Sequence, residues 1–372
     1  MNSVKKKILI STGLYPPEIG GPATYSKLMN DRLPDYGFDV FVLPFSTVRK
    51  YPKIIRHVVF FLKALGLTRK VDVVFAQDTV SVGLPTMLAC KILNKKFLVR
   101  VPGDYAWEQS TQRFGVTDSI DDFQNNKHGL RPELLKMIQR FVVNNATYVV
   151  TPSVYFKNLV SKWCKDPQKV NAIYNGIDFL KLNVSREDTR VSLKFEKDDF
   201  IILSSGRLVP WKGFDLLIKL VRKYMDEDKN IYLYIVGDGP DSDKLHAMVK
   251  NLGLEKRVLF LGSIPRDLLY KYLFASNVFA LNTGFESFSF QIVEAMYCKT
   301  PVVATMIGNL PEIIDNGIEG QLVKYNSLEE FEKALHRVMV DNDFVIKSTE
   351  LAKNKALNFS IDNTITNLIK LL

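Results

Sequence analysis

Short runs of apolar residues alternate along the chain with longer segments in which apolar residues recur at helical spacing. Such runs, bounded by turn residues, are typical of strands buried on both faces of a parallel sheet. The pattern predicts these strands in the first half of the chain: Lys7–Ser11, Asp39–Leu43, Val71–Ala76, Lys96–Val101 and Tyr148–Pro152. In the second half it predicts Phe200–Ser204, Ile231–Val236, Val258–Leu261, Val278–Leu281 and Pro301–Ala304.

Both halves of the chain open in the same way, with a strand, a glycine-containing loop and a helix. The two loops read GLYPPEIGGPATY and GRLVPWKGFDLL. Alternating strands and helices predict an α/β fold, and two doubly wound domains in tandem account for the repeat. The segment YNGIDFLKLN interrupts the pattern with Asn-Gly, so we place the domains at 1–176 and 177–357. The amphipathic segment 358–372 is predicted to be a helix that packs back on the first domain.

Length and composition agree with two globular domains and exclude several classes of protein. The chain has 372 residues, of which 47% are hydrophobic and only 3 are Cys, which excludes a disordered, collagen-like or disulfide-rich protein. Cys90, Cys164 and Cys298 follow no metal-binding or redox spacing, which is typical of buried thiols in a reducing cytoplasm. Apolar stretches fall short of the ~18 residues that a spanning helix needs. We therefore expect a cytoplasmic protein that does not cross a membrane.

The net charge of +10 lies entirely in the first half of the chain. Residues 1–175 hold 25 Lys or Arg against 13 Asp or Glu, whereas residues 176–372 hold 25 against 27. The densest stretch, 48–70, has seven cations, no acid and interleaved apolar residues; the cations that we assign to a surface are Arg49, Lys50, Lys53, Arg56 and Lys63. A basic amphipathic helix is suited to an anionic membrane surface. A core-packing helix with a solvated basic face explains the stretch as well, and the absence of a recognition module argues against nucleic acid.

Two glycine-containing loops carry candidate anion-binding groups, because ligands of open α/β sheets bind at the carboxyl ends of strands. Gly21 follows the first strand and precedes a predicted helix, so the backbone there can approach a phosphate; a plain tight turn is the alternative. In the second loop, Arg207 and Lys212 lie five residues apart around Pro210. A guanidinium and an ammonium at a strand end can bind phosphate oxygens, although isolated surface cations would look the same.

The segment NTGFESFSFQIVEAMYCKTPVVA carries two carboxylates around a predicted helix start. Glu286 lies in the loop, Ser287 or Ser289 can cap the helix, and Glu294 lies about two turns into it. A carboxylate accepts two hydrogen bonds and is suited to a vicinal diol such as those of sugars and ribose. Two glutamates on a solvated helix face remain the alternative interpretation.

Taken together, these segments resemble the glycosyltransferase family 4 group of GT-B enzymes, which transfer sugar from a nucleotide sugar with retention of configuration. The resemblance covers most of the chain and includes PPEIGG, NGID at 175–178, GRLVPWKGFDLLI, IVGDGP at 235–240, FLGSIP at 260–265, and the Glu-x7-Glu segment that continues to LPEII. It implies two Rossmann-like domains facing a central cleft, with the acceptor bound by the first domain and the donor by the second.

The resemblance also implies roles for individual residues. Glu286 would bind hydroxyls of the donor sugar and Glu294 those of the ribose. Arg207 and Lys212 would neutralise the diphosphate as the glycosidic bond breaks, which is electrostatic stabilisation of the transition state. No metal or other cofactor is expected if these cations do that work.

Four further positions match backbone contacts of the family. Backbone N–H groups at Phe288 and Ser289, together with Gly21 from the first domain, would complete the anion site. Ile264 matches a position at which the backbone meets the nucleotide base. The expected donor is a UDP-, GDP- or ADP-sugar.

Departures from the family pattern concern the acceptor and the donor sugar. The family often has a His at the end of the fourth strand, whereas this chain reads VRVPGDYAWE. Asp104 is the nearest candidate for a catalytic or acceptor contact, with Arg100 and Glu108 as weaker ones, unless Pro-Gly-Asp is merely a turn. Ser289 replaces a common Gly, and Gly308-Asn309 stands where Gly-Gly is frequent, so the donor preference can differ.

These observations predict a retaining, metal-independent glycosyltransferase at the inner face of the cell membrane that uses a lipid-linked or glycan acceptor to build a surface polysaccharide. Two alternatives stay open at this point. A nucleotide-sugar 2-epimerase would use the same architecture without an acceptor, and a non-catalytic subunit would only bind the nucleotide sugar.

Overall fold

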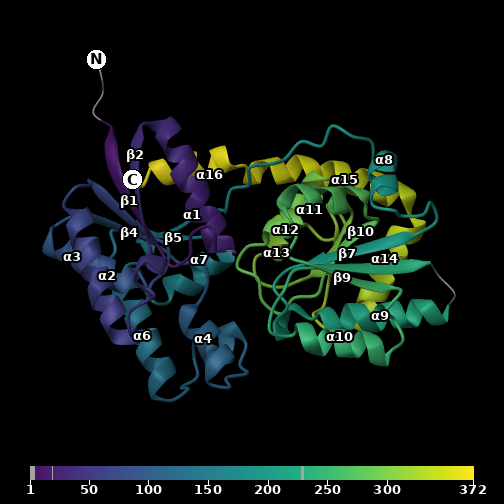
Figure 1. Cartoon of the computed structure of the whole chain (residues 1–372), viewed down its shortest axis with the longest axis horizontal. Helices are drawn as coiled ribbons and strands as arrows, with labels where there is room; N and C mark the ends of the chain where they lie inside the picture. Colours follow the sequence, from purple (N-terminus) through teal and green to yellow (C-terminus); the bar gives the residue numbers. More distant parts are fainter. Residues whose placement is uncertain (1–4, 19, 228–229) are drawn as a thin grey trace. The chain divides into compact units, whose positions relative to one another are not determined.

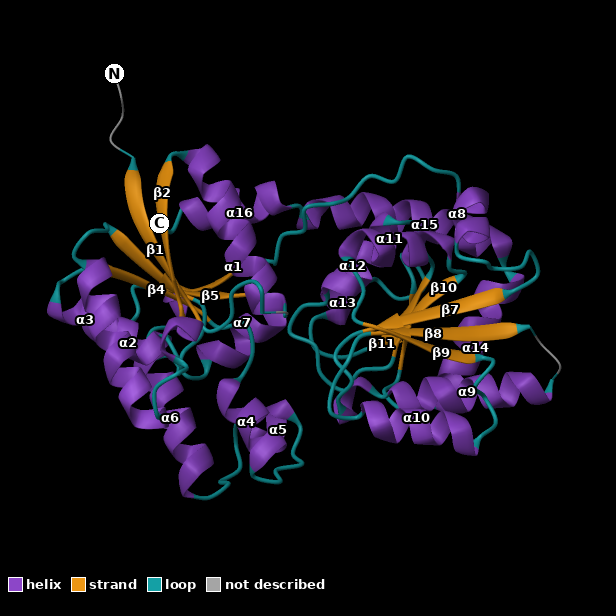
Figure 2. Cartoon of the chain, viewed as in Figure 1, coloured by secondary structure: helices purple, strands orange, loops and turns teal. Residues whose placement is uncertain are grey.

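The computed structural model describes residues 5–18, 20–227 and 230–372. The chain divides into two compact units, which we call unit 1 (Met1–Gly176 with Ile361–Leu372) and unit 2 (Ile177–Ser360). Each unit has a six-stranded parallel sheet with helices packed against it (Figures 1 and 2). The predicted α/β class with two doubly wound domains is confirmed.

The sheet of unit 1 has the strand order β2-β1-β3-β4-β5-β6. Its strands are β1 (Lys6–Thr12), β2 (Phe38–Pro44), β3 (Val73–Ala76), β4 (Lys96–Arg100), β5 (Tyr148–Thr151) and β6 (Val170–Ala172). The first five coincide closely with the predicted strands. The sequence pattern did not predict β6, a three-residue edge strand in which only Val170 is buried.

Helices flank this sheet, and the last helix of the chain belongs to it. They are α1 (Gly21–Arg32), α2 (Lys53–Thr68), α3 (Gly83–Ile92), α4 (Tyr105–Arg113), α5 (Ile120–Phe123), α6 (Leu130–Asn145), α7 (Val154–Ser161) and α16 (Ile361–Ile369). Ile361, Ile365 and Leu368 of α16 share one buried cluster with Ile8 and Ile10 of β1. Burial of this apolar stripe explains why a segment so far along the sequence completes the core of unit 1.

The sheet of unit 2 has the strand order β12-β11-β10-β7-β8-β9. Its strands are β7 (Phe200–Ser205), β8 (Ile231–Val236), β9 (Val258–Gly262), β10 (Val278–Leu281), β11 (Val302–Thr305) and β12 (Gln321–Val323). Only β12, another three-residue edge strand, was not predicted. Strand order reverses between β7 and β10, because β8 and β9 extend one way from β7 while β11 and β12 extend the other way from β10.

Eight helices of unit 2 fall within the described residues, and several cover a large apolar core. They are α8 (Arg186–Ser192), α9 (Phe214–Asp226), α10 (Ser242–Asn251), α11 (Arg266–Ala275), α12 (Phe290–Tyr297), α13 (Leu310–Ile313), α14 (Leu328–Val340) and α15 (Asn342–Ala356). Leu217 and Leu220 of α9, Leu245 of α10 and Phe331 of α14 pack with the central strands in this core. Across the described part of the whole chain, no helix is both long and apolar enough to span a bilayer.

Candidate functional site

The loops that follow β7 and β10 lie where the strand order of unit 2 reverses. In open α/β sheets this reversal leaves a crevice beyond the carboxyl ends of the two strands, and ligands bind there. The β7 loop carries Arg207 and Lys212, and the β10 loop carries Glu286. The sequence pattern predicts Arg207 and Lys212 at a strand end and Glu286 in a loop before a helix, and the topology brings these two loops together.

Lys212 and Glu286 form an ion pair across these two loops, in which the Lys212 Nζ donates a hydrogen bond to Glu286 Oε2. Their side chains are 13% and 12% exposed, so each charge is largely removed from water. Partial burial strengthens the attraction between them relative to a surface pair. The structure therefore holds a cation and a carboxylate together at the carboxyl edge of the sheet.

Backbone contacts hold the two loops in this arrangement. Gly213, directly after Lys212, has a positive φ of 49°, and a Cβ there would collide with Asn282. Asn282 Nδ2 donates to the Gly213 carbonyl at 3.0 Å, and the Gly284 N–H donates to the Trp211 carbonyl at 2.6 Å. The glycine is thus required for close approach, and Asn282 fixes the Lys212 loop against the Glu286 loop.

The IVGDGP motif has a related packing function beside the same loop. A Cβ on Gly237 would meet the carbonyl of Gly206, and one on Gly239 would meet the backbone of Leu208. The Leu208 N–H also donates to the Asp238 carbonyl at 3.0 Å. Both glycines therefore let the β8 loop pack against the loop that carries Arg207, whose side chain is exposed.

Glu294 lies inside α12 and is paired with Arg266, a residue that sequence analysis did not select. Arg266 Nε donates to Glu294 Oε1 at 2.9 Å, and Arg266 Nη2 donates to the Tyr270 hydroxyl at 3.0 Å. The Glu294 side chain is only 8% exposed. Burial raises the pKa of Glu294, and the Arg266 guanidinium opposes that rise. Glu294 is therefore a buried carboxylate held by a partly exposed cation, not a member of a solvated helix face.

The start of α12 brings the remaining predicted donor-site positions close to Glu286. Ser289 is the capping residue, because its Oγ accepts a hydrogen bond from the Ile292 N–H at 3.4 Å, and Phe288 precedes it with a buried ring. The loop after β11 contacts this segment, since the Asn309 N–H donates to the Glu286 carbonyl at 3.2 Å. The Asn309 side chain is fully buried, and its amide has no hydrogen-bond partner among the residues that the structure describes. Ile264 is half-buried, two residues before Arg266.

Asp104 of unit 1 lies in a buried, hydrogen-bonded environment. It caps α4, and its Oδ1 accepts hydrogen bonds from the Trp107 N–H at 3.1 Å and from Gln139 Nε2 at 3.0 Å. Gln124 Nε2 donates to its Oδ2 at 2.8 Å, and the residue is 1% exposed. These partners make Asp104 the structural cap of α4, and its contact with an acceptor or donor sugar stays a prediction.

The neighbouring alternatives are also engaged in local structure. Arg100 is 2% exposed, lies 3.8 Å from the centre of the Tyr25 ring and donates to Asn175 Oδ1 at 2.6 Å. Burial lowers the pKa of Arg100 to about 10. Glu108 lies in the first turn of α4. Gly21 is the first residue of α1, and Ile19 in the loop before it lies outside the described residues.

The basic stretch 48–70 forms α2 from residue 53 onward, preceded by a short 3-10 turn. Arg49 pairs with Glu18, and Arg56 lies over the Phe45 ring at 5.5 Å. Lys50, Lys53 and Lys63 are exposed. The five predicted surface cations therefore differ in how readily they could bind an anionic surface, because Arg49 is already paired with Glu18.

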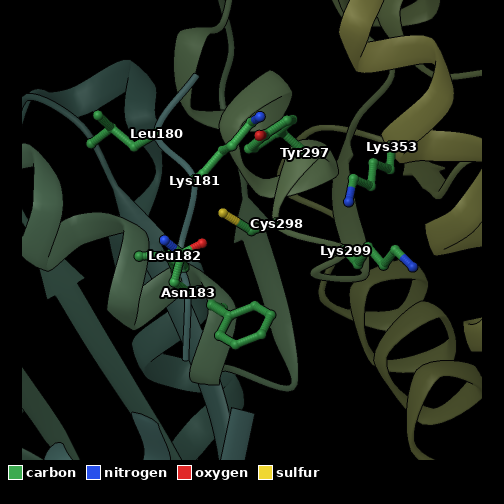
Figure 3. Close-up of a pocket in the computed structure, with 9 residues that line it drawn as sticks. Leu180, Lys181, Leu182, Asn183, Tyr297, Cys298, Lys299 and Lys353 are labelled. Atoms are coloured by element: carbon green, nitrogen blue, oxygen red, sulfur yellow. The ribbon is translucent and has the colours of Figure 1, made fainter. Parts of the chain in front are cut away.

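A pocket of about 420 Å³ opens elsewhere in unit 2 (Figure 3). Lys181 and Asn183 come from the segment before α8, Tyr297 and Cys298 from the end of α12, and Lys353 from α15. Because α12 begins at the carboxyl edge of the sheet, its end lies at the opposite edge. This pocket is therefore separate from the Lys212–Glu286 pair.

Arg266 and Asn282 are the site residues that sequence analysis missed. Arg266 is 28 residues from Glu294, and no local spacing predicts that pairing. Asn282, the first residue after β10, carried a usable signal, because an amide at the end of a buried strand needs partners.

Comparisons with known proteins find similarity in both units. The family model described as glycosyl transferases group 1 matches residues 185–357, and the model described as glycosyltransferase family 4 matches residues 19–179. A glycosyltransferase of Methanocaldococcus jannaschii is 33% identical over 202 residues, which are 53% of this chain and 52% of that protein. D-inositol 3-phosphate glycosyltransferase of Corynebacterium glutamicum is 29% identical over 63% of this chain and 58% of its own length. The chain spans about half the length of the curated relatives that it matches.

Solved structures show the same architecture over almost the whole chain. Sucrose-phosphate synthase from Thermosynechococcus elongatus has a TM-score of 0.83 at 18% identity, covering 99% of this chain and 98% of its own. Anabaena HepE, solved in complex with UDP-glucose, has a TM-score of 0.79 at 19% identity, covering 98% of both chains. The fold is therefore GT-B. Since the two family models together match both units, the chain belongs to glycosyltransferase family 4.

Proposed function

We propose that the protein is a retaining glycosyltransferase that transfers a sugar from a nucleotide diphosphate sugar to a lipid-linked or glycan acceptor. The observation that carries this proposal is the Lys212–Glu286 ion pair at the strand-order reversal of unit 2. Family membership and the UDP-glucose complex of the HepE neighbour favour a UDP-sugar donor. GDP- and ADP-sugars are the alternative donors.

In this proposal the pair has two functions in sugar transfer: it binds the donor sugar and it stabilises the charge on the diphosphate. Glu286 accepts hydrogen bonds from hydroxyls of the donor sugar and holds the ring in place. Lys212, with Arg207 on the same loop, lies beside the diphosphate and stabilises the negative charge that develops on it. Glu294 accepts hydrogen bonds from ribose hydroxyls, while the backbone at Ile264, Phe288 and Ser289 completes the nucleotide site.

Transfer with retention follows from attack on the face that the leaving group occupies. The bond between the anomeric carbon and the β-phosphate oxygen breaks, and the acceptor oxygen forms a bond to the same carbon. The acceptor proton passes to the departing phosphate oxygen, so that atoms and charge balance. In this proposal Arg207 and Lys212 neutralise the leaving group, and no metal ion is assigned a step.

The acceptor side of the proposal rests on the charge of unit 1. Its excess of cations favours an acceptor presented at an anionic surface, which we assign to the cytoplasmic face of the cell membrane and to the synthesis of a surface polysaccharide.

The proposal is tested by incubating the protein with UDP-glucose, GDP-mannose or ADP-glucose and a lipid extract. Nucleotide release and the anomeric configuration of the product are followed by NMR, and melting is followed in parallel. One donor at about 100 times its Kd should stabilise the protein by about 2.7 kcal/mol. An α-linked product from an α-linked donor supports retention. Failure of all three donors to shift the melting temperature or release nucleotide would refute the proposed function.

A further inference from the structure

The helix α6 exposes an apolar stripe that sequence analysis did not identify. Leu130, Leu134, Met137 and Phe141 recur at intervals of four, three and four residues and are 92%, 50%, 60% and 45% exposed. Residues on other faces of the helix, among them Val142, are buried against unit 1. A stripe of this spacing normally faces a core, so its exposure here indicates a missing partner.

Two neighbouring helices continue this apolar surface. Helix α3 packs against both α2 and α6, and Figure 1 shows the three helices side by side on unit 1. Ile55, Val58 and Leu62 of α2 are exposed along one face. Leu88 and Ile92 of α3 are also exposed. We call these exposed apolar residues of α2, α3 and α6, together with the cations among them, the three-helix surface.

The charges on these helices have nearly one sign. Helices α2, α3 and α6 contain seven Lys or Arg and a single acid, Glu133, which is already paired with Lys136 at 3.0 Å. Lys53 and Lys63 of α2, Lys91 of α3, and Arg131 and Arg140 of α6 are exposed. An apolar surface interspersed with exposed cations is complementary to a bilayer, whose acyl chains are apolar and whose headgroups carry negative charge.

The composition of the apolar set favours a bilayer over a protein partner. Protein interfaces concentrate their binding energy in Trp, Tyr and Arg anchors that fill pockets of the partner. Among the exposed apolar residues named above, Phe141 is the only aromatic one, and the others are aliphatic or Met. Aliphatic side chains spread over three helices can enter the acyl region without a matching pocket.

We propose that the three-helix surface binds an anionic lipid bilayer, with the α6 stripe inserted below the headgroups and the cations of α2, α3 and α6 bound to lipid phosphates. This inference deepens the proposed function, because it rests on an acceptor presented at a membrane and names the surface and the lipid chemistry. The sequence-based assignment emphasised the charge of α2, whereas the structure assigns the apolar insertion chiefly to α6.

Flotation of the full chain with vesicles tests this surface. The vesicles contain 30 mol% phosphatidylglycerol in phosphatidylcholine, and a second set contains phosphatidylcholine alone. The stripe variant combines Leu134→Ser, Met137→Ser and Phe141→Ser. Its matched control combines Val340→Ser, Ile346→Ser and Leu351→Ser, which replace exposed apolar residues of α14 and α15 in unit 2. Circular dichroism melts establish that both variants fold.

We expect wild type and control to float with the anionic vesicles at low salt, and the stripe variant to bind roughly tenfold or more weakly. A charge variant combines Lys63→Gln, Lys91→Gln and Arg140→Gln. Its affinity for anionic vesicles should be roughly tenfold or more below that of the wild type at low salt, and close to that of the wild type at 1 M salt.

The inference would be overturned if the wild-type protein did not bind anionic vesicles, or if the stripe variant and its control lost vesicle binding equally. It would also be overturned if the wild-type protein formed a dimer that the stripe substitutions dissociate, without binding vesicles. Measuring UDP binding on the same preparations separates this inference from the proposed function. If the protein binds UDP but no vesicles, only the membrane-binding inference is contradicted. If it binds vesicles but no nucleotide sugar, only the proposed glycosyltransferase function is contradicted.

Discussion

The two units share a parallel α/β architecture, but the polar groups at their strand ends differ in burial and in their hydrogen-bond partners. In unit 2, Lys212 and Glu286 stay partly exposed and paired with each other. In unit 1, Asp104 is buried beneath three donors, and Asp78 after β3 accepts a hydrogen bond from the Val82 N–H at 3.1 Å. Burial raises the pKa of both aspartates. Position at a strand end is therefore insufficient to identify a reactive group, because partners and burial decide its chemistry.

The sharpest test of this contrast is the removal of either charge of the unit 2 pair. Lys212→Ala and Glu286→Ala should each lower turnover by about 100-fold or more, because a positioned charge near the reacting bond has been removed. Initial rates of transfer measure the effect. Lys333→Ala is the matched control, since Lys333 pairs with Glu329 on α14 with both side chains well exposed. Wild-type rates in both site variants would remove this pair from the mechanism.

Replacing Asp104 tests the contrast between the units from the side of unit 1, where the strand-end carboxylate is buried. Asp104→Ala should lower the free energy of unfolding by about 2 kcal/mol, because α4 loses its cap and the amides of Gln124 and Gln139 lose an acceptor. Urea denaturation measures the loss, and Asp104→Asn should recover part of it. A variant with unchanged stability but abolished transfer would support the catalytic prediction for Asp104 and break the contrast between the units.

The Arg266–Glu294 pair gives the smallest expected effect and an informative pH dependence. Arg266→Met should weaken UDP binding roughly tenfold with little change in kcat, because Glu294 loses the cation that orients it. Isothermal titration and steady-state kinetics measure the two quantities. A large loss of kcat with unchanged affinity would contradict a positioning role for Arg266 in the nucleotide site.

The pH dependence of stability in this variant has a defined sign. A raised pKa means that folded Glu294 holds its proton at a pH where the unfolded chain has released it, so stability falls as pH rises through that window. Without Arg266 the pKa rises further, and the stability deficit of Arg266→Met should grow from acidic to neutral pH. In a Glu294→Gln background the growth should vanish, and its persistence there would assign it to another group.

Local pattern was sufficient to predict most of the fold, because buried parallel strands are continuous apolar runs. All ten predicted strands form, and the missed strands β6 and β12 are three-residue edge strands with too few apolar positions to stand out. The helix of the basic stretch begins at Lys53 after Pro52, and its exposed apolar face could not be distinguished from a buried one by periodicity. Long-range burial, not local propensity, decides that difference.

The candidate site was predictable where a motif matched the family and less so where distant partners decide the environment. Ser289 caps α12, one of the two possibilities that the sequence offered. The burial of Glu294 depends on Arg266 and Tyr270, which lie on another helix. Asp104 caps α4, which its position directly before a helical segment also predicts, and its catalytic role stays a prediction.

The packing of α16 into unit 1 has a consequence for biosynthesis. A ribosome delivers every residue of unit 2 before it delivers Ile361–Leu372, so unit 2 can close its core while unit 1 still lacks its last helix. Until then Ile8 and Ile10 lack part of their apolar cover, and the carbonyl of Leu372 has not yet accepted the hydrogen bond from Lys6 Nζ. The half of the protein that is synthesised first therefore cannot complete its core until Ile361–Leu372 have been synthesised.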